Sequence, residues 1–321
     1  MMSFGPVPSR RLGCSLGVNN IPPKACTYSC VYCQLGTTKA QQGKRRSFFE
    51  PREILNAVRS RLERTLNTVD KIDYISFVPD GEPSLDINLG HEIDLLKTFG
   101  IKIAVISNTS LIWRDDVKED LLKADWVSFK IDSLKDEIWN KINRPHDSFQ
   151  MQPILDGLVD FADAYKGILT VETMLINEIN DREDDIREVG NYLTRLKPDK
   201  TYLSIPTRPP AEDWVSASKE KVINRSYQIL NDMNVNVEYL IGYEGNEFAF
   251  TGDVKEGLLS ITSVHPMRSD AVNEYLSKAN SDWRVIDSLI REGELVQVTY
   301  NDNIFYMRRL NKNICDAHPE F

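Results

Sequence analysis

The sequence predicts an α/β protein, a partial (β/α)6 TIM-like barrel over residues 1–250 followed by a small winged-helix-like domain over residues 251–321. Two observations lead to this prediction. From about residue 51 to residue 240, apolar and β-branched runs alternate with helical stretches, which is typical of βα units and a parallel sheet. After residue 253 the pattern changes to three helical stretches and two strands joined by a short polar turn, which is typical of a winged helix.

The elements follow in chain order. A first strand is expected at about residues 14–18, ahead of a long loop. The later barrel strands are expected at about residues 72–78, 101–107, 125–131, 168–175, 200–206 and 235–241. The helices of the barrel are expected at about residues 51–66, 86–98, 115–122, 151–165, 182–196 and 218–233. The C-terminal domain is expected to contain helices at about 253–259, 268–278 and 281–291 and strands at about 295–300 and 304–308.

Composition indicates in which compartment the protein is expected and which kinds of partner it is expected to bind. No apolar run approaches the roughly 18 residues that span a bilayer, so we expect no membrane association. The cysteine count of 5 is odd, and no apolar signal segment follows Met1, so we expect a cytoplasmic protein without a disulfide framework. The net charge of −9 disfavours nucleic acid as a partner, although the basic residues between Lys39 and Arg46 could hold a phosphate.

Three cysteines lie within eight residues of the first long loop, at Cys26, Cys30 and Cys33. Thiolates at C-x3-C-x2-C spacing can bind three irons of a four-iron cluster and leave the fourth iron open to a ligand. A structural zinc site would need a fourth ligand, and the nearest downstream histidine is His91. The spacing therefore favours an iron-sulfur site that performs chemistry.

The carboxyl ends of barrel strands are where functional residues gather. The strand ending at residue 78 is followed by Asp80, Gly81 and Glu82, and the next strand is followed by Ser107 and Asn108. Both runs also suit an ordinary turn or a helix cap. As ligand groups, the short polar side chains after the second of these strands could hydrogen-bond a ribose, with Asn108 as the candidate.

The strand over residues 125–131 alternates, with Ser128, Lys130 and Asp132 on one face. Because helices cover the outer face of a barrel strand, this polar face should point into the cavity. Lys130 is a candidate for binding substrate, for orienting a carboxylate, or for forming a Schiff base if its pKa were lowered.

Two further candidates come from later strands. Glu172 is a carboxylate within a strand and needs a cation or a cavity near it. Arg208 follows Thr207 and precedes two prolines, which suits a grip on a carboxylate or a phosphate, or a pairing with a surface acid. Lys130, Glu172 and Arg208 are therefore the candidate catalytic residues.

The cysteine loop resembles the C-x3-C-x-aromatic-C motif of radical S-adenosylmethionine (SAM) enzymes, with Tyr32 at the aromatic position. The resemblance implies one 4Fe-4S cluster on the three cysteines and SAM on its open iron. Gly81 and Glu82 are similar to the motif that meets the methionine amino group in that superfamily. The residues expected to contact SAM are Tyr32, Gly81, Glu82, Ser107, Asn108, Lys130, Asp132 and Thr207.

Other segments narrow the resemblance to a stand-alone group catalogued near the wyosine-forming tRNA enzymes. The segments are Gly5–Gly13, Cys26–Gly36, Gly81–Pro83, Asn143–Pro145, Glu172–Leu175, Asn180–Asp181 and Thr207–Pro210. Wyosine-forming enzymes carry further cysteines upstream for a second cluster, whereas only Cys14 precedes Cys26 here. A second cluster is therefore not expected, and a wyosine-type tRNA modification stays an alternative.

The resemblance implies an anaerobic reaction. Reductive cleavage of SAM would give methionine and a 5'-deoxyadenosyl radical that abstracts hydrogen from an unidentified substrate. An electron donor such as ferredoxin or flavodoxin would be a partner, and water should be kept out of the cavity.

The C-terminal part leaves two rival functions open. A winged helix could read out cluster state on DNA as a sensor or transcription regulator, but residues 253–321 hold 8 Lys and Arg against 11 Asp and Glu. A simple electron carrier would need no cavity lined by polar residues. His265, before Pro266, is expected to make a hydrogen bond at a helix entrance, with a ligand role as the alternative.

Overall fold

The structure is a computed structural model that describes residues 2–65, 71–242, 248, 250 and 252–309. Residue 66 of the first predicted helix and Cys315 lie outside the described residues.

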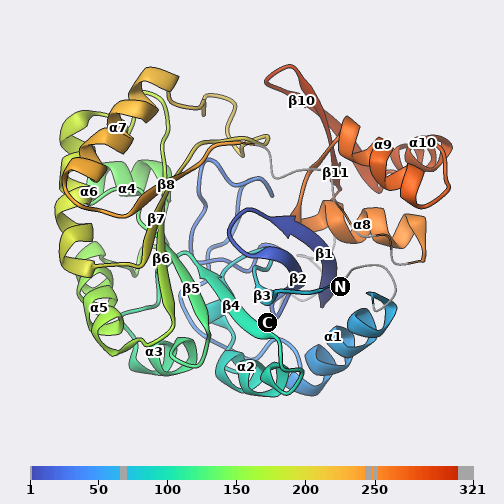
Figure 1. Cartoon of the computed structure of the whole chain (residues 1–321), viewed down its shortest axis with the longest axis horizontal. Helices are drawn as coiled ribbons and strands as arrows, with labels where there is room; N and C mark the ends of the chain where they lie inside the picture. The colour runs from blue at the N-terminus through green and yellow to red at the C-terminus, as the bar shows by residue number, and fades with distance from the viewer. Residues whose placement is uncertain (1, 66–70, 243–247, 249, 251, 310–321) are drawn as a thin grey trace.

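One eight-stranded sheet forms the larger part of the molecule (Figure 1). Its strands lie in chain order, β2 to β8 are parallel, and β1 runs antiparallel to β2. The bounds are β1 Ser3–Ser9, β2 Gly13–Val18, β3 Tyr74–Phe77, β4 Lys102–Ser107, β5 Trp126–Lys130, β6 Ile168–Met174, β7 Lys200–Ser204 and β8 Val237–Leu240.

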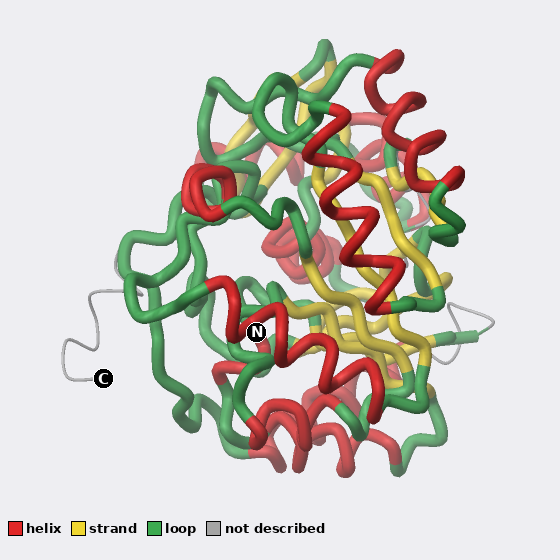
Figure 2. Tube along the Cα trace, turned by 90° about the vertical axis from the view of Figure 1, so that its left-hand side faces the viewer, coloured by secondary structure: helices red, strands yellow, loops and turns green. Residues whose placement is uncertain are grey.

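Helices cover the outer face of this sheet (Figures 1 and 2). Between β2 and β8, each pair of successive parallel strands is joined through at least one α-helix, which gives the predicted six βα units. The bounds are α1 Pro51–Thr65, α2 Leu89–Lys97, α3 Asp115–Leu121, α4 Asp136–Ile142, α5 Met151–Ala164, α6 Glu183–Leu196 and α7 Glu220–Asp232. A short 3-10 helix, Pro83–Leu85, precedes α2.

The hydrophobic core lies between the sheet and these helices. Ile75 and Phe77 of β3 are fully buried in it, as are Val127 and Phe129 of β5. These residues alternate with polar ones along their strands, as the sequence pattern predicts for helix-covered barrel strands. The predicted strands and helices of the barrel are present, with ends shifted by at most three residues.

One strand and one α-helix of the barrel were not predicted. The first is β1, whose Gly5, Pro6 and Pro8 argue against a strand; proline is tolerated there because β1 lies at the edge of the sheet. The second is α4, a helix of only seven residues between β5 and α5. Short helices give too few turns for a periodic apolar pattern to be recognised.

The hairpin of β1 and β2 lies at the open side of the partial barrel. The guanidinium of Arg10, in the hairpin turn, donates to the carbonyl of Leu240 at the end of β8 over 3.2 Å. The first and last parallel strands are therefore bridged by a side chain, since the described part of the sheet shows no pairing of β8 with β1 or β2.

The C-terminal part contains three helices and a three-stranded antiparallel sheet of order β10-β11-β9. It has a core of its own, in which Leu258, Tyr275 and Ile286 are fully buried. In Figure 1 it lies beside β1 and α1. The bounds are α8 Val254–Val264, β9 Met267–Arg268, α9 Ser269–Lys278, α10 Arg284–Arg291, β10 Leu295–Tyr300 and β11 Asn303–Arg308.

One prediction about this part is wrong in position. The first of its predicted helices was expected to end at residue 259, with His265 at the entrance of the next helix. The helix α8 instead continues to Val264, and the amide of His265 closes it by donating to the carbonyl of Ile261. Thr262 and Ser263 belong to this last turn, where Thr262 bonds back to the Leu258 carbonyl.

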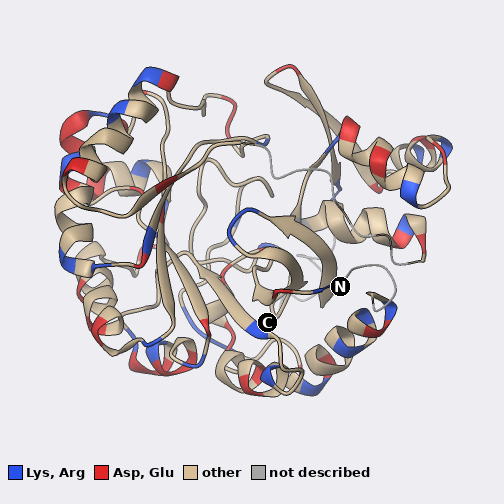
Figure 3. Ribbon diagram, in the orientation of Figure 1, with Lys and Arg blue, Asp and Glu red and all other residues tan. Residues whose placement is uncertain are grey.

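Charges of both signs are intermixed on the outer helices (Figure 3). Among the described residues, no helix is both long enough and apolar enough to span a membrane.

Candidate iron-sulfur and SAM site

The cysteine loop follows β2 and is held by backbone hydrogen bonds from distant segments. The amides of Ser29 and Val31 donate to carbonyls at the end of α4 and just beyond it, and Gln42 donates to the carbonyl of Cys26. Tyr28 is buried against Trp139 of α4. The unpredicted helix α4 therefore fixes the loop that carries Cys26, Cys30 and Cys33.

Each of the three cysteine sulfurs receives one side-chain N–H from a different segment. Asn108, just after β4, lies 3.5 Å from Cys26 Sγ, and Asn143, after α4, lies 3.6 Å from Cys30 Sγ. The ammonium of Lys24 lies 3.8 Å from Cys33 Sγ. Donors placed around sulfur are the outer interactions that stabilise thiolates bound to a metal.

Burial raises the pKa of Cys30 to about 12, although the amide of Asn143 opposes the shift. Burial also raises the pKa of Cys26, and Cys30 and Cys33 add to the shift, so the sulfurs are close enough to repel one another as thiolates. A bound metal cation removes this repulsion and deprotonates coordinating thiols. The described residues form no group of three or more His, Cys, Asp or Glu side chains that could hold a metal ion, and the three sulfurs with their donors suit instead the cluster that the sequence motif implies.

Glu82 is fully buried and joins two strand ends. Its carboxylate accepts from the Ser84 amide at 3.1 Å, the Ser107 hydroxyl at 2.8 Å and the Asn108 amide at 2.6 Å, and also from the Ser84 hydroxyl. Burial raises its pKa and these donors oppose the shift. Four protein donors therefore already occupy the carboxylate that was predicted to meet SAM.

Gly81 and Asp80 complete this strand end. A Cβ at Gly81 would lie 1.9 Å from the carbonyl oxygen of Ala25, so only glycine lets β3 approach the residue before Cys26. Asp80 is 3% exposed, and its Oδ1 has no hydrogen-bond partner among the described residues. Burial raises the pKa of Asp80 to about 7 against the opposing charge of Lys24.

Tyr32 and Asp132 lie on the other side of the loop. The Tyr32 hydroxyl donates to Asp132, which also accepts from Asn143 Nδ2 at 2.7 Å and from the Met174 amide at 2.9 Å. The Lys130 ammonium lies 4.8 Å from the centre of the Tyr32 ring. The structure thus brings Tyr32, Lys130 and Asp132 together at the end of β5.

Lys130 and Glu172 form a largely buried ion pair at 3.0 Å, and Arg11 from the hairpin turn contacts the other oxygen of Glu172 at 2.6 Å. Burial opposes ionisation of Glu172, but Lys130 and Arg11 outweigh it and lower the pKa to about 2. Burial alone would lower the pKa of Lys130, because it disfavours the charged ammonium. The negative charges of Glu172 and Asp132 outweigh burial and hold this pKa above its usual value. A Schiff-base lysine needs the opposite shift, so this alternative for Lys130 is not supported.

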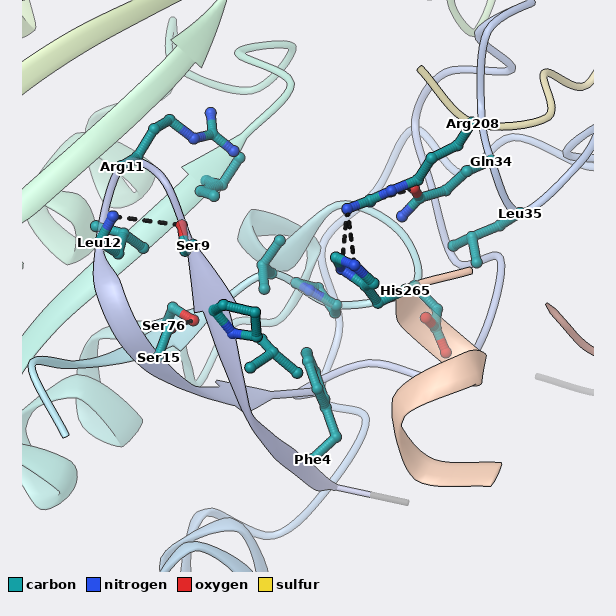
Figure 4. Close-up of a pocket in the computed structure, with 16 residues that line it drawn as sticks. Phe4, Ser9, Arg11, Leu12, Ser15, Gln34, Leu35, Ser76, Arg208 and His265 are labelled. Atoms are coloured by element: carbon teal, nitrogen blue, oxygen red, sulfur yellow. Dashed lines mark hydrogen bonds between the residues drawn. The ribbon is translucent and has the colours of Figure 1, made fainter. Parts of the chain in front are cut away.

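Arg208 lies apart from that pair, at a cavity of about 180 Å³ (Figure 4). Its guanidinium donates to Gln34 Oε1 at 2.6 Å and lies 2.9 Å from His265 Nδ1. The other walls come mainly from the β1–β2 hairpin and from β3 and the residues after it, including Phe4, Ser15, Ser76 and Asp80. Thr207 precedes Arg208 in the same loop after β7.

Sequence reasoning missed Lys24, Asn143 and Arg11 as site residues. Asn143 and Arg11 stood in the segments on which the family resemblance rests, but their contacts depend on segments far apart in the chain. Cys14 lies in β2, where its amide donates to Asp73, and burial raises the pKa of its thiol.

Comparison with known proteins decides the family. Residues 20–189 match the family model described as the Radical SAM superfamily. The chain belongs to the radical SAM superfamily. A UPF0026 protein of Methanocaldococcus jannaschii is 46% identical over 318 residues, covering 98% of both chains, so this radical SAM chain also belongs to the UPF0026 family.

Solved radical SAM structures share the fold. A radical SAM methyltransferase from Sphaerobacter thermophilus matches with a TM-score of 0.56 at 15% identity, over 71% of this chain and 66% of that chain. The structure of TYW1 with a lysine-pyruvate adduct bound matches with a TM-score of 0.53 at 16% identity, over 68% and 73%. At these identities the likeness establishes the fold alone. Membership of the radical SAM superfamily makes the chain an enzyme and implies a 4Fe-4S cluster and SAM as its cofactors.

Proposed function

We propose that this chain holds a single 4Fe-4S cluster on Cys26, Cys30 and Cys33 and cleaves SAM reductively. The bound cluster and SAM would supply an electron and a 5'-deoxyadenosyl radical that takes hydrogen from a substrate. The observation that carries the proposal is the set of three loop sulfurs, each with its own N–H donor.

SAM would lie over the ends of β3, β4 and β5. Gly81 and Glu82 would lie beside the methionine part of SAM. Ser107 and Asn108 would lie beside its ribose. The remaining residues proposed to contact SAM are Tyr32, Lys130, Asp132 and Thr207. Because Glu82 already accepts four hydrogen bonds, its role would be to hold the two strand ends in place for SAM. Gly81 would keep this end close to the cysteine loop.

The substrate would enter the cavity beside Arg208. A cavity of about 180 Å³ is slightly larger than one that encloses benzene, so it would take one small polar group of the substrate. Arg208 would bind an anionic or carbonyl oxygen, and the open oxygen of Asp80 would accept a hydroxyl or amino hydrogen. Lys130 and Glu172 would instead serve to keep the barrel closed around SAM, through Arg11.

Residues 251–321 would be a winged-helix-like domain that covers this cavity. The order α8, β9, α9, α10, β10, β11 suits that fold, and its His265 lies against Arg208. A DNA-reading role is less favoured because Arg284, at the start of α10, pairs with Asp282.

The basic segment from Lys39 to Arg46 also offers little to a nucleic acid. Arg45 pairs with Asp116 and Asp120, and Arg46 lies over the ring of Phe48. Only Lys39 and Lys44 of its four basic residues are exposed.

A ferredoxin or flavodoxin would be the electron donor, and the reaction would take place in an anaerobic cytoplasm.

The test is SAM cleavage by protein purified without oxygen and reconstituted with iron and sulfide. Dithionite and SAM are added, and 5'-deoxyadenosine is measured by chromatography. The intact chain should form it, Cys30→Ala should not, and Cys14→Ala, which alters a cysteine outside the loop, should match the intact chain. A four-iron cluster that neither binds nor cleaves SAM would overturn the proposal and favour a sensor.

A further inference from the structure

The donors around the three loop sulfurs differ in charge. Asn108 and Asn143 offer neutral amides to Cys26 and Cys30, whereas Lys24 offers an ammonium to Cys33. Lys24 thus places a positive charge 3.8 Å from one sulfur of the proposed cluster site.

Lys24 is fixed at both ends. Its backbone amide donates to the carbonyl of Asp80 at 2.7 Å, and its φ of 67° lies in the left-handed region that few lysines adopt. Its ammonium donates to the carbonyl of Gly36, whose amide in turn bonds to the carbonyl of Cys33. The charge is therefore held against the loop and does not move freely in solvent.

The charge of Lys24 is not neutralised by a salt bridge, although it acts on the nearby buried carboxyl of Asp80. Across the described ranges of the chain, no carboxylate makes an ion pair with it, whereas Lys130 pairs with Glu172 and lies 3.9 Å from Asp132. Lys24 is half-buried, so salt screens it less than an exposed charge.

We propose that Lys24 sets the reduction potential of the cluster. The potential of an iron-sulfur cluster depends on nearby charge and on hydrogen bonds to its sulfurs. One-electron reduction adds a negative charge to the cluster, and a fixed cation beside Cys33 favours that reduced state. Lys24 thereby raises the potential and eases the electron transfer that SAM cleavage requires. This inference rests on the proposed function.

The experiment is a redox titration of the reconstituted cluster by dithionite, followed by electron paramagnetic resonance of the reduced form. Four proteins are compared: the intact chain, Lys24→Gln, Lys24→Arg and Lys39→Gln. Lys39 is an exposed lysine between the cysteines and α1, so its replacement removes the same charge from the chain. Iron and sulfide contents are measured for each, and the signal reports only the molecules that hold a cluster.

Lys24→Gln should lower the equilibrium constant for one-electron reduction at least tenfold, which is about 59 mV. Lys24→Arg keeps the charge and should stay within about threefold of the intact chain by the same relation. Lys39→Gln should leave the constant unchanged.

Equal potentials for Lys24→Gln and the intact chain would overturn the inference, as would an equal shift in Lys39→Gln. Complete loss of the cluster in Lys24→Gln would also overturn it, since Lys24 would then act only as an anchor of the loop. If the intact chain itself assembles no four-iron cluster, the proposed function fails. If it cleaves SAM while Lys24→Gln keeps its potential, only the role of Lys24 fails.

Discussion

The guanidinium of Arg11 meets the carboxylate of Glu172 at 2.6 Å, although 161 residues separate them in the chain. Arg11 stands in the turn of the β1–β2 hairpin and Glu172 in the middle of the parallel sheet. Together with the contact between Lys130 and Glu172, this makes a largely buried cluster of three charges that holds the hairpin against the parallel strands.

Replacement of Glu172 should therefore cost stability. In Glu172→Ala two largely buried cations lose their shared acid, and removing one partner of a buried pair typically costs about 3–5 kcal/mol. Urea unfolding measures the loss. Glu63→Ala, at an exposed acid of α1 with no ion pair in the described structure, should change the free energy of unfolding by less than about 0.5 kcal/mol. Equal effects of the two changes would contradict this account of the cluster.

Glu92 of α2 should make stability fall with rising pH. Burial, helped by the charge of Asp86, raises its pKa to about 9. Above the unfolded pKa of about 4.3 the unfolded chain releases this proton while the folded chain keeps it, so unfolding becomes easier up to about pH 9. Glu92→Gln should be more stable than the intact chain by roughly 5 kcal/mol at pH 8 and nearly equal at pH 4. Unfolding curves are measured for both proteins at the two pH values. The same difference in stability between Glu92→Gln and the intact chain at pH 4 and at pH 8 would contradict this role of Glu92.

Alanine at position 81 should disturb the cysteine loop. Its Cβ would meet the Ala25 carbonyl at 1.9 Å, so either β3 or the residue before Cys26 must move. We expect a loss of about 1–3 kcal/mol in stability and several-fold less iron bound after reconstitution. Gly242→Ala is the matched control because, among the described residues, its Cβ would meet Arg10 alone, at 3.7 Å. Iron content that stays normal in Gly81→Ala would contradict the close approach of the two segments.

The contact between the C-terminal part and the barrel includes a hydrogen bond from the Tyr300 hydroxyl to the carbonyl of Pro206 at 3.1 Å. Tyr300→Phe should weaken the docking by about 0.5–1.5 kcal/mol. Hydrogen exchange should then be faster in the loop that carries Arg208 and in β10. Tyr239→Phe, which removes an exposed hydroxyl bonded to Asn224, should leave both segments unchanged. Faster exchange throughout the barrel would instead indicate general destabilisation.

Local patterns in the sequence were sufficient for much of the fold and for part of the site. The cysteine spacing, the βα alternation and the polar face of β5 are all written in consecutive residues, and the structure has each of them. The edge strand β1 could not be recognised in the sequence because it contains two prolines. The helix α4 could not be recognised because it is only seven residues long. The sequence did not reveal the roles of Lys24, Asn143 and Arg11. Their side chains contact segments far away in the chain, and such contacts produce no periodic pattern in consecutive residues.

The link between Arg10 and Leu240 has a consequence for synthesis of the chain. It joins residues 230 apart, and a ribosome adds roughly 5–20 residues per second, so the hairpin turn is made roughly 10–50 s before its partner strand exists. Throughout that interval the cysteine loop, which is made shortly after the hairpin, has no barrel around it. The nascent thiols are therefore without the protection of the barrel for that whole interval.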